Sequence, residues 1–316
     1  MRIVWIASLF VIAGCGDSPA GSGSNHDGSA AIADMAMGPP DLAYQSLVLA
    51  RPYKSKIPIG YDPKKPAPLL ILLHGYTADG ALQDGYFGLS NIVDEKGFLY
   101  AFPDGVIDQM NHRFWNATDA CCDLYRTNVD DVAYVNAIID DMSFKYSVDP
   151  KRIFIAGHSN GAFMSHRLAC DSAPRVAAIM ALAGDNWKDV TKCQPANPVS
   201  ILQVHGDADS VIKYNGGSNP YFPPNQPAMN ADYPSAHDSV GSWIKLNGCS
   251  PTAAPGTPID LDSGVGGAET TIEKWGGCKA GTAVELWTIR NGSHVPAFQK
   301  AWAATFYDWL AAHPKQ

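Results

Sequence analysis

The stretch that decides the fold reads Gly157-His158-Ser159-Asn160-Gly161, which is a G-x-S-x-G motif. Residues 152–156 form a short apolar run before it and predict a buried strand, and residues 162–170 after it have helical character. A strand, a tight turn and a helix in this order place a serine Oγ at the top of an α/β sheet. Small residues suit the turn because its backbone passes close to its neighbours. Ser159 is therefore a candidate nucleophile.

Other segments alternate between strand-like and helix-like patterns. The predicted strands are residues 69–73, 98–102, 176–182, 200–204 and 284–289, and the predicted helices are residues 132–146, 238–246 and 297–310. Such alternation predicts an α/β fold with a mostly parallel sheet and helices on both faces. In such a sheet, ligands bind beyond the carboxyl ends of the strands.

A serine hydroxyl needs a base to activate it and a carboxylate to orient that base. After a G-x-S-x-G motif the acid comes next in the chain and the histidine last. The predicted strand at residues 200–204 leads into His205-Gly206-Asp207-Ala208-Asp209. We favour Asp209 as the acid because Asp207 falls in the tight turn beside glycine. Asp207 stays the alternative, and a turn-forming role is an alternative for both aspartates.

The chain has nine histidines, and three of them follow the candidate acids. His294 comes directly after the predicted strand at residues 284–289, which makes it the predicted base. His313 lies close to the C-terminus, and His237 precedes a predicted helix. We expect the side chain of His158 to point away from the serine, so that packing or a surface contact is the better interpretation than catalysis.

Two backbone N–H groups are candidates for stabilising an oxyanion. One belongs to Asn160, directly after the nucleophile, and the other to Tyr76, in the loop after the predicted strand at residues 69–73. Trp115 and Trp187 are candidates for lining an acyl pocket. Each tryptophan is interpreted equally well as a core or rim residue.

The N-terminus has the pattern of an export signal. Residues 1–14 start with a charge, continue with a short apolar run and end in small residues, which predicts a signal peptide. Residues 11–15, Val-Ile-Ala-Gly-Cys, resemble a bacterial lipobox. This implies cleavage before Cys15 and a lipid on its sulfur that holds the protein at a membrane; an ordinary signal peptide is the alternative. We expect a flexible tether at residues 15–42 and a catalytic domain at residues 43–316.

Charge and cysteine content exclude some classes of function. The net charge of −8 argues against a nucleic-acid partner, because phosphate binding needs a basic face. Six cysteines besides Cys15 predict disulfides in an exported chain. They are Cys121, Cys122, Cys170, Cys193, Cys249 and Cys278. A bond between the adjacent Cys121 and Cys122 would be strained, so we expect each to pair elsewhere. The spacing shows no zinc-type cluster, and we expect neither a metal nor a cofactor.

Several further stretches carry a resemblance to a known family. They are Leu72-Leu73-His74-Gly75-Tyr76, Ala101-Phe102-Pro103-Asp104-Gly105, Trp115-Asn116, Asp130-Asp131-Val132, Arg167-Leu168-Ala169-Cys170, Asn247-Gly248-Cys249 and Val284-Glu285-Leu286-Trp287. With the serine motif they resemble the secreted α/β hydrolases that include polyhydroxybutyrate depolymerases, feruloyl esterases and acetylxylan esterases. The resemblance implies an α/β-hydrolase fold, a serine esterase with Ser159, Asp209 and His294 as its triad, and a disulfide between Cys249 and Cys278.

One departure from the family bears on the substrate. Members often carry Trp-Pro-Gly soon after the catalytic histidine, whereas here His294 is followed by Val295-Pro296-Ala297. Because this loop borders the pocket, feruloyl or acetyl esters and hydroxybutyrate oligomers stay open as substrates. Two other classes also stay open: an inactive surface lipoprotein that binds a glycan or a protein, and a peptidase on the same fold.

Overall fold

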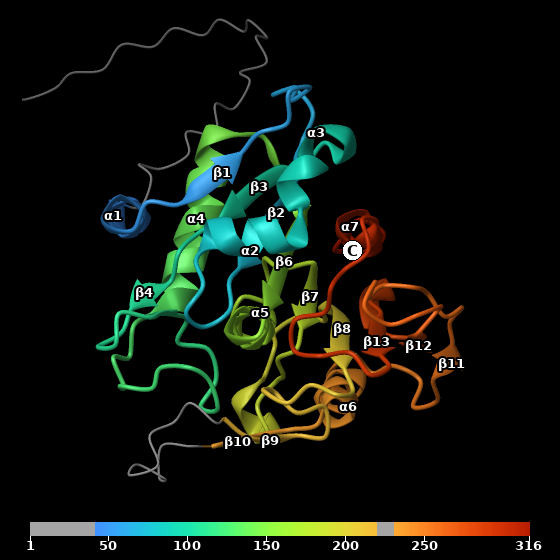
Figure 1. The fold of residues 1–316 in the computed structure, drawn as a ribbon. Helices are drawn as coiled ribbons and strands as arrows, with labels where there is room; N and C mark the ends of the chain where they lie inside the picture. The colour runs from blue at the N-terminus through green and yellow to red at the C-terminus, as the bar shows by residue number, and fades with distance from the viewer. Residues whose placement is uncertain (1–41, 220–230) are drawn as a thin grey trace, which may run out of the picture. The chain divides into compact units, whose positions relative to one another are not determined.

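The computed structural model describes residues 42–219 and 231–316 (Figure 1). Contacts divide the chain into two units, Met1–Pro40 and Asp41–Gln316. The predicted signal peptide, Cys15 and nearly all of the predicted tether lie outside the described residues. Within the described ranges, no helix has both the length and the apolar character needed to cross a membrane.

A nine-stranded sheet forms the centre of the second unit. Its strand order is β1-β3-β2-β6-β7-β8-β13-β12-β11. The bounds are β1 Lys54–Lys56, β2 Ala67–Leu73, β3 Leu99–Phe102, β6 Val148–His158, β7 Ala178–Leu182, β8 Ser200–Gly206, β11 Ala254–Pro255, β12 Thr270–Trp275 and β13 Val284–Ile289. The inner strands from β3 to β13 pair in parallel, whereas β1, β12 and β11 pair antiparallel at the edges.

Helices cover both faces of this sheet (Figure 1). They are α1 Leu42–Ala50, α2 Gly80–Phe87, α3 Val93–Lys96, α4 Asp131–Lys145, α5 Asn160–Asp171, α6 Ala236–Asn247 and α7 Trp302–Ala311, with short 3-10 turns η1 Leu89–Asn91, η2 Val190–Lys192 and η4 Lys279–Gly281. Leu69 and Ile71 of β2 share a core with α4, α5 and α6, whereas Leu70 and Leu72 share one with α2, α3 and α7. Alternate residues of one buried strand therefore supply both cores.

The predicted α/β fold is confirmed, with differences at the edges. The strand expected at residues 284–289 is β13. Two separate two-stranded sheets, β4 (Val106–Ile107) with β5 (Arg113–Phe114) and β9 (Gly217–Ser218) with β10 (Asp232–Tyr233), lie outside the main sheet. The closing helix begins at Trp302 rather than at residue 297. The expected start was wrong because Phe298 forms a β-bridge with Asp262 and the Ala297 N–H donates to Asp262 Oδ1.

The six cysteines form three disulfides. Cys249 is bonded to Cys278, at the ends of α6 and β12, and Cys170 at the end of α5 is bonded to Cys193. Cys121 is bonded to its neighbour Cys122, so the expectation that each pairs elsewhere was wrong. The peptide bond between these two residues is cis.

A buried histidine makes stability depend on pH. His166 of α5 is fully buried, with Nε2 at 2.8 Å from Gln203 Oε1, and it accepts the Trp243 Nε1–H at Nδ1. Burial lowers the pKa of His166 to about 4, and its hydrogen bonds offset this only in part. Because the folded pKa lies below the unfolded value of about 6.5, its stabilising contribution is present above pH 6.5. That contribution is lost as the pH falls towards 4.

We therefore expect the wild type to lose about 2 kcal/mol more unfolding free energy between pH 7 and pH 5 than His166→Gln does. The glutamine keeps a polar amide at this position and has no proton to gain. Urea unfolding of both proteins at the two pH values measures the difference. Equal losses in both proteins would show that folding does not lower the pKa of His166.

Candidate active site

Ser159 occupies the turn between β6 and α5. Its backbone has φ 54° and ψ −120°, a strained conformation for an L-residue, and its N–H donates to Leu182 O of β7. A Cβ added to Gly161 would lie 2.1 Å from Leu73 O, so the turn can pack against β2 only with glycine at that position. The chain therefore presents Ser159 at the carboxyl ends of the parallel strands.

Asp209 and His294 form a hydrogen-bonded pair. His294 Nδ1 donates to Asp209 Oδ2 at 2.7 Å, and Asp209 Oδ1 accepts the backbone N–H groups of Val211 and Ile212. Burial opposes ionisation of Asp209, but hydrogen bonds from His205 and His294 outweigh it and hold the pKa of Asp209 well below its usual range. Because Nδ1 donates to this carboxylate, Nε2 of His294 is the atom that can take a proton.

Asp207, the alternative acid, has a different contact. Its Oδ1 accepts the backbone N–H of Asn291 at 2.6 Å, which holds the loop that carries His294. A Cβ added to Gly206 would lie 2.3 Å from Gly292 O, so glycine at 206 lets the loop after β8 lie against the loop after β13. Asp209 thus contacts the imidazole of His294, whereas Asp207 holds the loop that carries His294.

The loop of His294 also contacts the serine turn. His158 Nε2 donates to His294 O at 2.9 Å, and the two rings lie 5.0 Å apart. Burial lowers the pKa of His158 to about 3, so it is a neutral donor. Tyr86 OH donates to Pro296 O at 2.9 Å. Sequence reasoning missed both contacts, and the one signal for them was the place of His158 inside the serine motif.

Among the described residues, no hydrogen bond joins Ser159 Oγ to His294. The two residues nevertheless lie at the same edge of the sheet. His158, the residue before Ser159, donates a hydrogen bond to the backbone oxygen of His294. Catalytic hydrogen bonds are often long before a substrate binds and then tighten. The lack of this hydrogen bond is therefore compatible with a catalytic pair.

The candidate oxyanion donors lie beside Ser159. A Cβ added to Gly75 would lie 3.4 Å from Ser159 Cβ, so the loop that carries Tyr76 passes over the serine. The Tyr76 side chain is held elsewhere, since its hydroxyl donates to Asp108 Oδ2 at 2.6 Å. Asn160 follows the serine directly at the positive end of α5. Both backbone N–H groups therefore belong to segments that contact Ser159.

Trp115 lies in the core behind these donors. Its side chain has no exposed surface, and its Nε1–H donates to His74 O at 3.0 Å. The Asn160 side chain accepts the Trp115 N–H at 2.7 Å and donates to Trp115 O at 2.9 Å. Trp115 thus supports the loop at residues 74–76 and the start of α5, and it offers no surface to a substrate.

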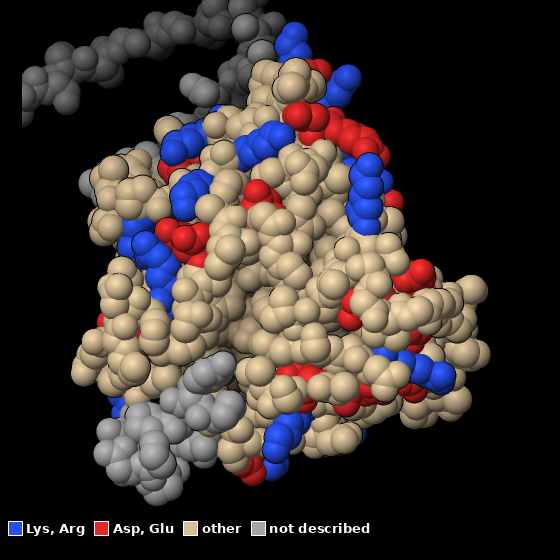
Figure 2. Space-filling model, viewed as in Figure 1, with Lys and Arg blue, Asp and Glu red and all other residues tan. Residues whose placement is uncertain are grey.

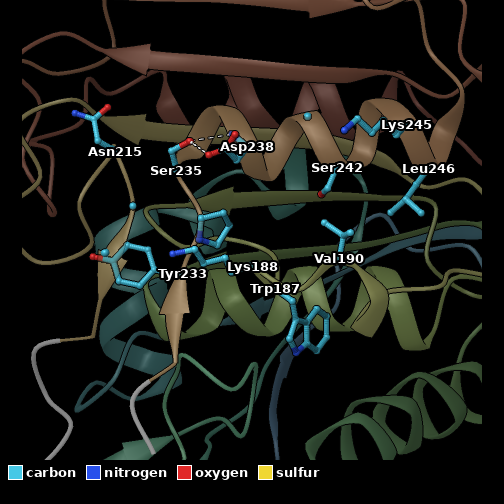
Figure 3. Close-up of a pocket in the computed structure, with 14 residues that line it drawn as sticks. Trp187, Lys188, Val190, Asn215, Tyr233, Ser235, Asp238, Ser242, Lys245 and Leu246 are labelled. Carbon is cyan, nitrogen blue, oxygen red and sulfur yellow. Dashed lines mark hydrogen bonds between the residues drawn. The ribbon is translucent and has the colours of Figure 1, made fainter. Parts of the chain in front are cut away.

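Trp187 lies in a separate cavity of about 620 Å³ beside α6 (Figure 3). Other residues that line this cavity include Lys188, Asn215, Tyr233, Ser242 and Lys245. Ser159, Asp209 and His294 do not line it. The structure therefore does not bring Trp187 together with the triad.

Charged side chains lie mainly around the margin of the face drawn in Figure 2. The hollow at the centre of this face, over the end of α5 in Figure 1, is formed by residues other than Lys, Arg, Asp and Glu. An uncharged ligand suits such a surface better than a phosphate or a strongly ionic group.

Residues 58–222 match the family described as Phospholipase/Carboxylesterase. The chain belongs to this family. One similar protein is feruloyl esterase B of Piromyces equi. It is 32% identical over 242 residues, which cover 76% of this chain and 41% of the relative. The putative esterase NocK of Nocardia uniformis subsp. tsuyamanensis is 26% identical over 239 residues, 72% of this chain and 64% of the relative. The chain thus spans less than two thirds of the length of both relatives.

Solved structures of esterases share the fold. The acetyl xylan esterase from Aspergillus awamori superposes with a TM-score of 0.57 at 13% identity, covering 81% of this chain and 92% of that structure. The esterase PE8 superposes with a TM-score of 0.53 at 14% identity, covering 83% and 98%. At these identities the likeness establishes the α/β-hydrolase fold alone.

Proposed function

We propose that this carboxylesterase-family chain is a serine esterase that hydrolyses feruloyl or acetyl esters of polysaccharides. The observation that carries the proposal is the 2.7 Å contact between His294 Nδ1 and Asp209 Oδ2, next to the strained serine turn. The family supports ester hydrolysis. The names of its relatives, feruloyl esterase B among them, support the class of substrate.

The reaction is an acyl transfer to water. His294 Nε2 takes the Ser159 proton while Ser159 Oγ attacks the ester carbonyl, and the Asp209 carboxylate stabilises the imidazolium. The N–H groups of Tyr76 and Asn160 stabilise the oxyanion. His294 then gives the proton to the departing alcohol, and a water molecule activated by the same imidazole releases the acid.

The proposed location rests on the sequence. Residues 11–15 have the pattern of a lipid-attachment signal, so we place the domain at a cell-envelope membrane through a lipid on Cys15. A polar segment at residues 15–42 then separates the lipid from the esterase domain.

A hydrolysis panel tests the proposed substrate class. We expect the wild type to cleave methyl ferulate or acetylated xylan, Ser159→Ala to cleave neither, and Ser143→Ala, a serine change on α4, to match the wild type. Cleavage of hydroxybutyrate oligomers alone would overturn the polysaccharide-ester assignment. Cleavage of matched amides in preference to esters would instead identify a peptidase.

A further inference from the structure

One short segment contacts both parts of the chain that carry the candidate oxyanion donors. It consists of residues 113–115, which are β5 and the tryptophan after it, and we call it the bridging segment. The donors are the N–H groups of Tyr76 and Asn160. The strands that lead to them, β2 and β6, are neighbours in the sheet, but their pairing ends at Leu73 and Gly157. Both donors lie beyond these last paired residues, so contacts outside the sheet fix their relative position.

The bridging segment holds the loop of the first donor on both sides. Arg113 O accepts the Thr77 N–H at 2.9 Å, and the Trp115 Nε1–H donates to His74 O at 3.0 Å. The donor residue, Tyr76, lies between His74 and Thr77 in the chain. Its backbone is therefore flanked by two hydrogen bonds to the same segment.

The ring of His74 stiffens this loop further. Its Nδ1–H donates to Gly75 O at 2.8 Å, and its Nε2 accepts the Gly105 N–H at 2.8 Å. Burial lowers the pKa of His74 to about 4, so the ring is neutral near pH 7 and keeps one donor and one acceptor. The loop therefore has a fixed shape at neutral pH.

The side chain of Asn160 holds the other end of the bridging segment. Its Oδ1 accepts the Trp115 N–H at 2.7 Å, and its Nδ2–H donates to Trp115 O at 2.9 Å. Neither residue has exposed surface, so water does not compete for these bonds. The backbone N–H of Asn160 is the candidate donor, and its side chain ties that donor to the bridging segment.

Oxyanion donors have to lie within about 2.7–3.1 Å of the place where the negative charge develops. A misplacement of about 1 Å can cost on the order of 100-fold in rate. The bridging segment hydrogen-bonds to both donor segments, and it therefore connects them where the sheet no longer does.

We propose that the bridging segment sets the spacing between the N–H groups of Tyr76 and Asn160. The indole of Trp115 and the side-chain amide of Asn160 are then positioning groups, because they act through these N–H groups and do not contact the reacting atoms. The proposal rests on the serine esterase function proposed above. It gives Trp115 a part in stabilising the transition state, although its side chain has no surface for a substrate.

Two variants each break one end of this connection. Trp115→Phe keeps an aromatic ring in the core and loses the N–H that donates to His74 O, and Asn160→Ala keeps the backbone N–H and loses both side-chain bonds. Each is expected to lower kcat on 4-nitrophenyl acetate on the order of 10- to 100-fold, while KM stays within about twofold. Trp243→Phe is the matched control, because this buried tryptophan loses the same kind of bond, to His166 Nδ1, outside the bridging segment. Its kcat should stay within about twofold of the wild-type value.

Inhibition by trifluoroacetone separates positioning from a general loss of structure. Ser159 Oγ adds to the carbonyl carbon of this ketone, the serine proton passes to His294 Nε2, and the carbonyl oxygen becomes an oxyanion that needs the same two donors. The inhibition constant should therefore rise in Trp115→Phe by about the factor by which kcat/KM falls. Partial unfolding would instead lower the concentration of active sites and leave the inhibition constant of the folded enzyme unchanged.

Wild-type kcat in either variant, or a lower kcat with an unchanged inhibition constant, would overturn the proposal. If Trp115→Phe does not fold, the same two measurements on Asn160→Ala decide it. Fluorophosphonate labelling of the wild type tests the esterase function separately. A labelled Ser159 together with variants of wild-type kcat would refute only the role of the bridging segment, whereas an unlabelled Ser159 would refute the esterase function itself.

Discussion

Replacing Ser159 with alanine is expected to lower kcat on ester substrates by about 10⁴- to 10⁶-fold, since the covalent step then has no nucleophile. The Ala side chain fits the turn because it is smaller than serine, so the urea unfolding midpoint should change little. Steady-state hydrolysis of 4-nitrophenyl acetate measures the loss.

The Ser159→Ala variant is expected to keep a low residual rate of ester hydrolysis. Oxyanion donors and binding alone retain a small acceleration over water when a triad member is missing, so some activity above background is expected. Ser143→Ala is the matched serine control. A Ser159→Ala protein with more than a tenth of wild-type kcat would show that another residue carries out the attack.

The second large effect concerns the candidate acid. Asp209→Asn is expected to lower kcat by about 10⁴-fold, because an amide cannot hold His294 in the tautomer with hydrogen on Nδ1 or stabilise the imidazolium. The loop should keep its shape, since an asparagine oxygen can still accept the N–H groups of Val211 and Ile212. Hydrolysis of 4-nitrophenyl acetate near pH 7 measures the loss.

Asp207→Asn is the matched control two residues away. Its oxygen can still accept the Asn291 N–H, so kcat should fall less than about tenfold. A larger loss in Asp207→Asn than in Asp209→Asn would reverse the assignment of the acid and leave the contact between Asp209 and His294 without a catalytic role.

Local sequence patterns predicted the main architecture. The aliphatic run before the serine motif, the motif itself and the helix after it gave the order β6, turn and α5, and strand-end positions singled out Asp209 and His294 as candidates. These signals work because each involves neighbours in the chain. The start of α7 was misplaced since a distant residue, Asp262, holds Phe298 in extended form.

The contacts that hold the site could not be predicted from the sequence. His158 contacts a residue 136 positions away, and Tyr86 one 210 positions away. The contact of Gln203 with Asp185 depends on the pairing of β7 with β8, which a single sequence does not show. The bond between Cys121 and Cys122 was missed for a different reason, because a cis peptide bond between two non-proline residues is rare.

The central claim is that Ser159 is activated by His294. Labelling with a fluorophosphonate, followed by peptide mass spectrometry, tests it most directly in the wild type and in a folded His294→Gln variant. We expect one modified residue, Ser159, and labelling at least about 100-fold slower in the variant because the general base is missing. An unmodified Ser159 in the wild type, or equal labelling rates in the two proteins, would contradict it.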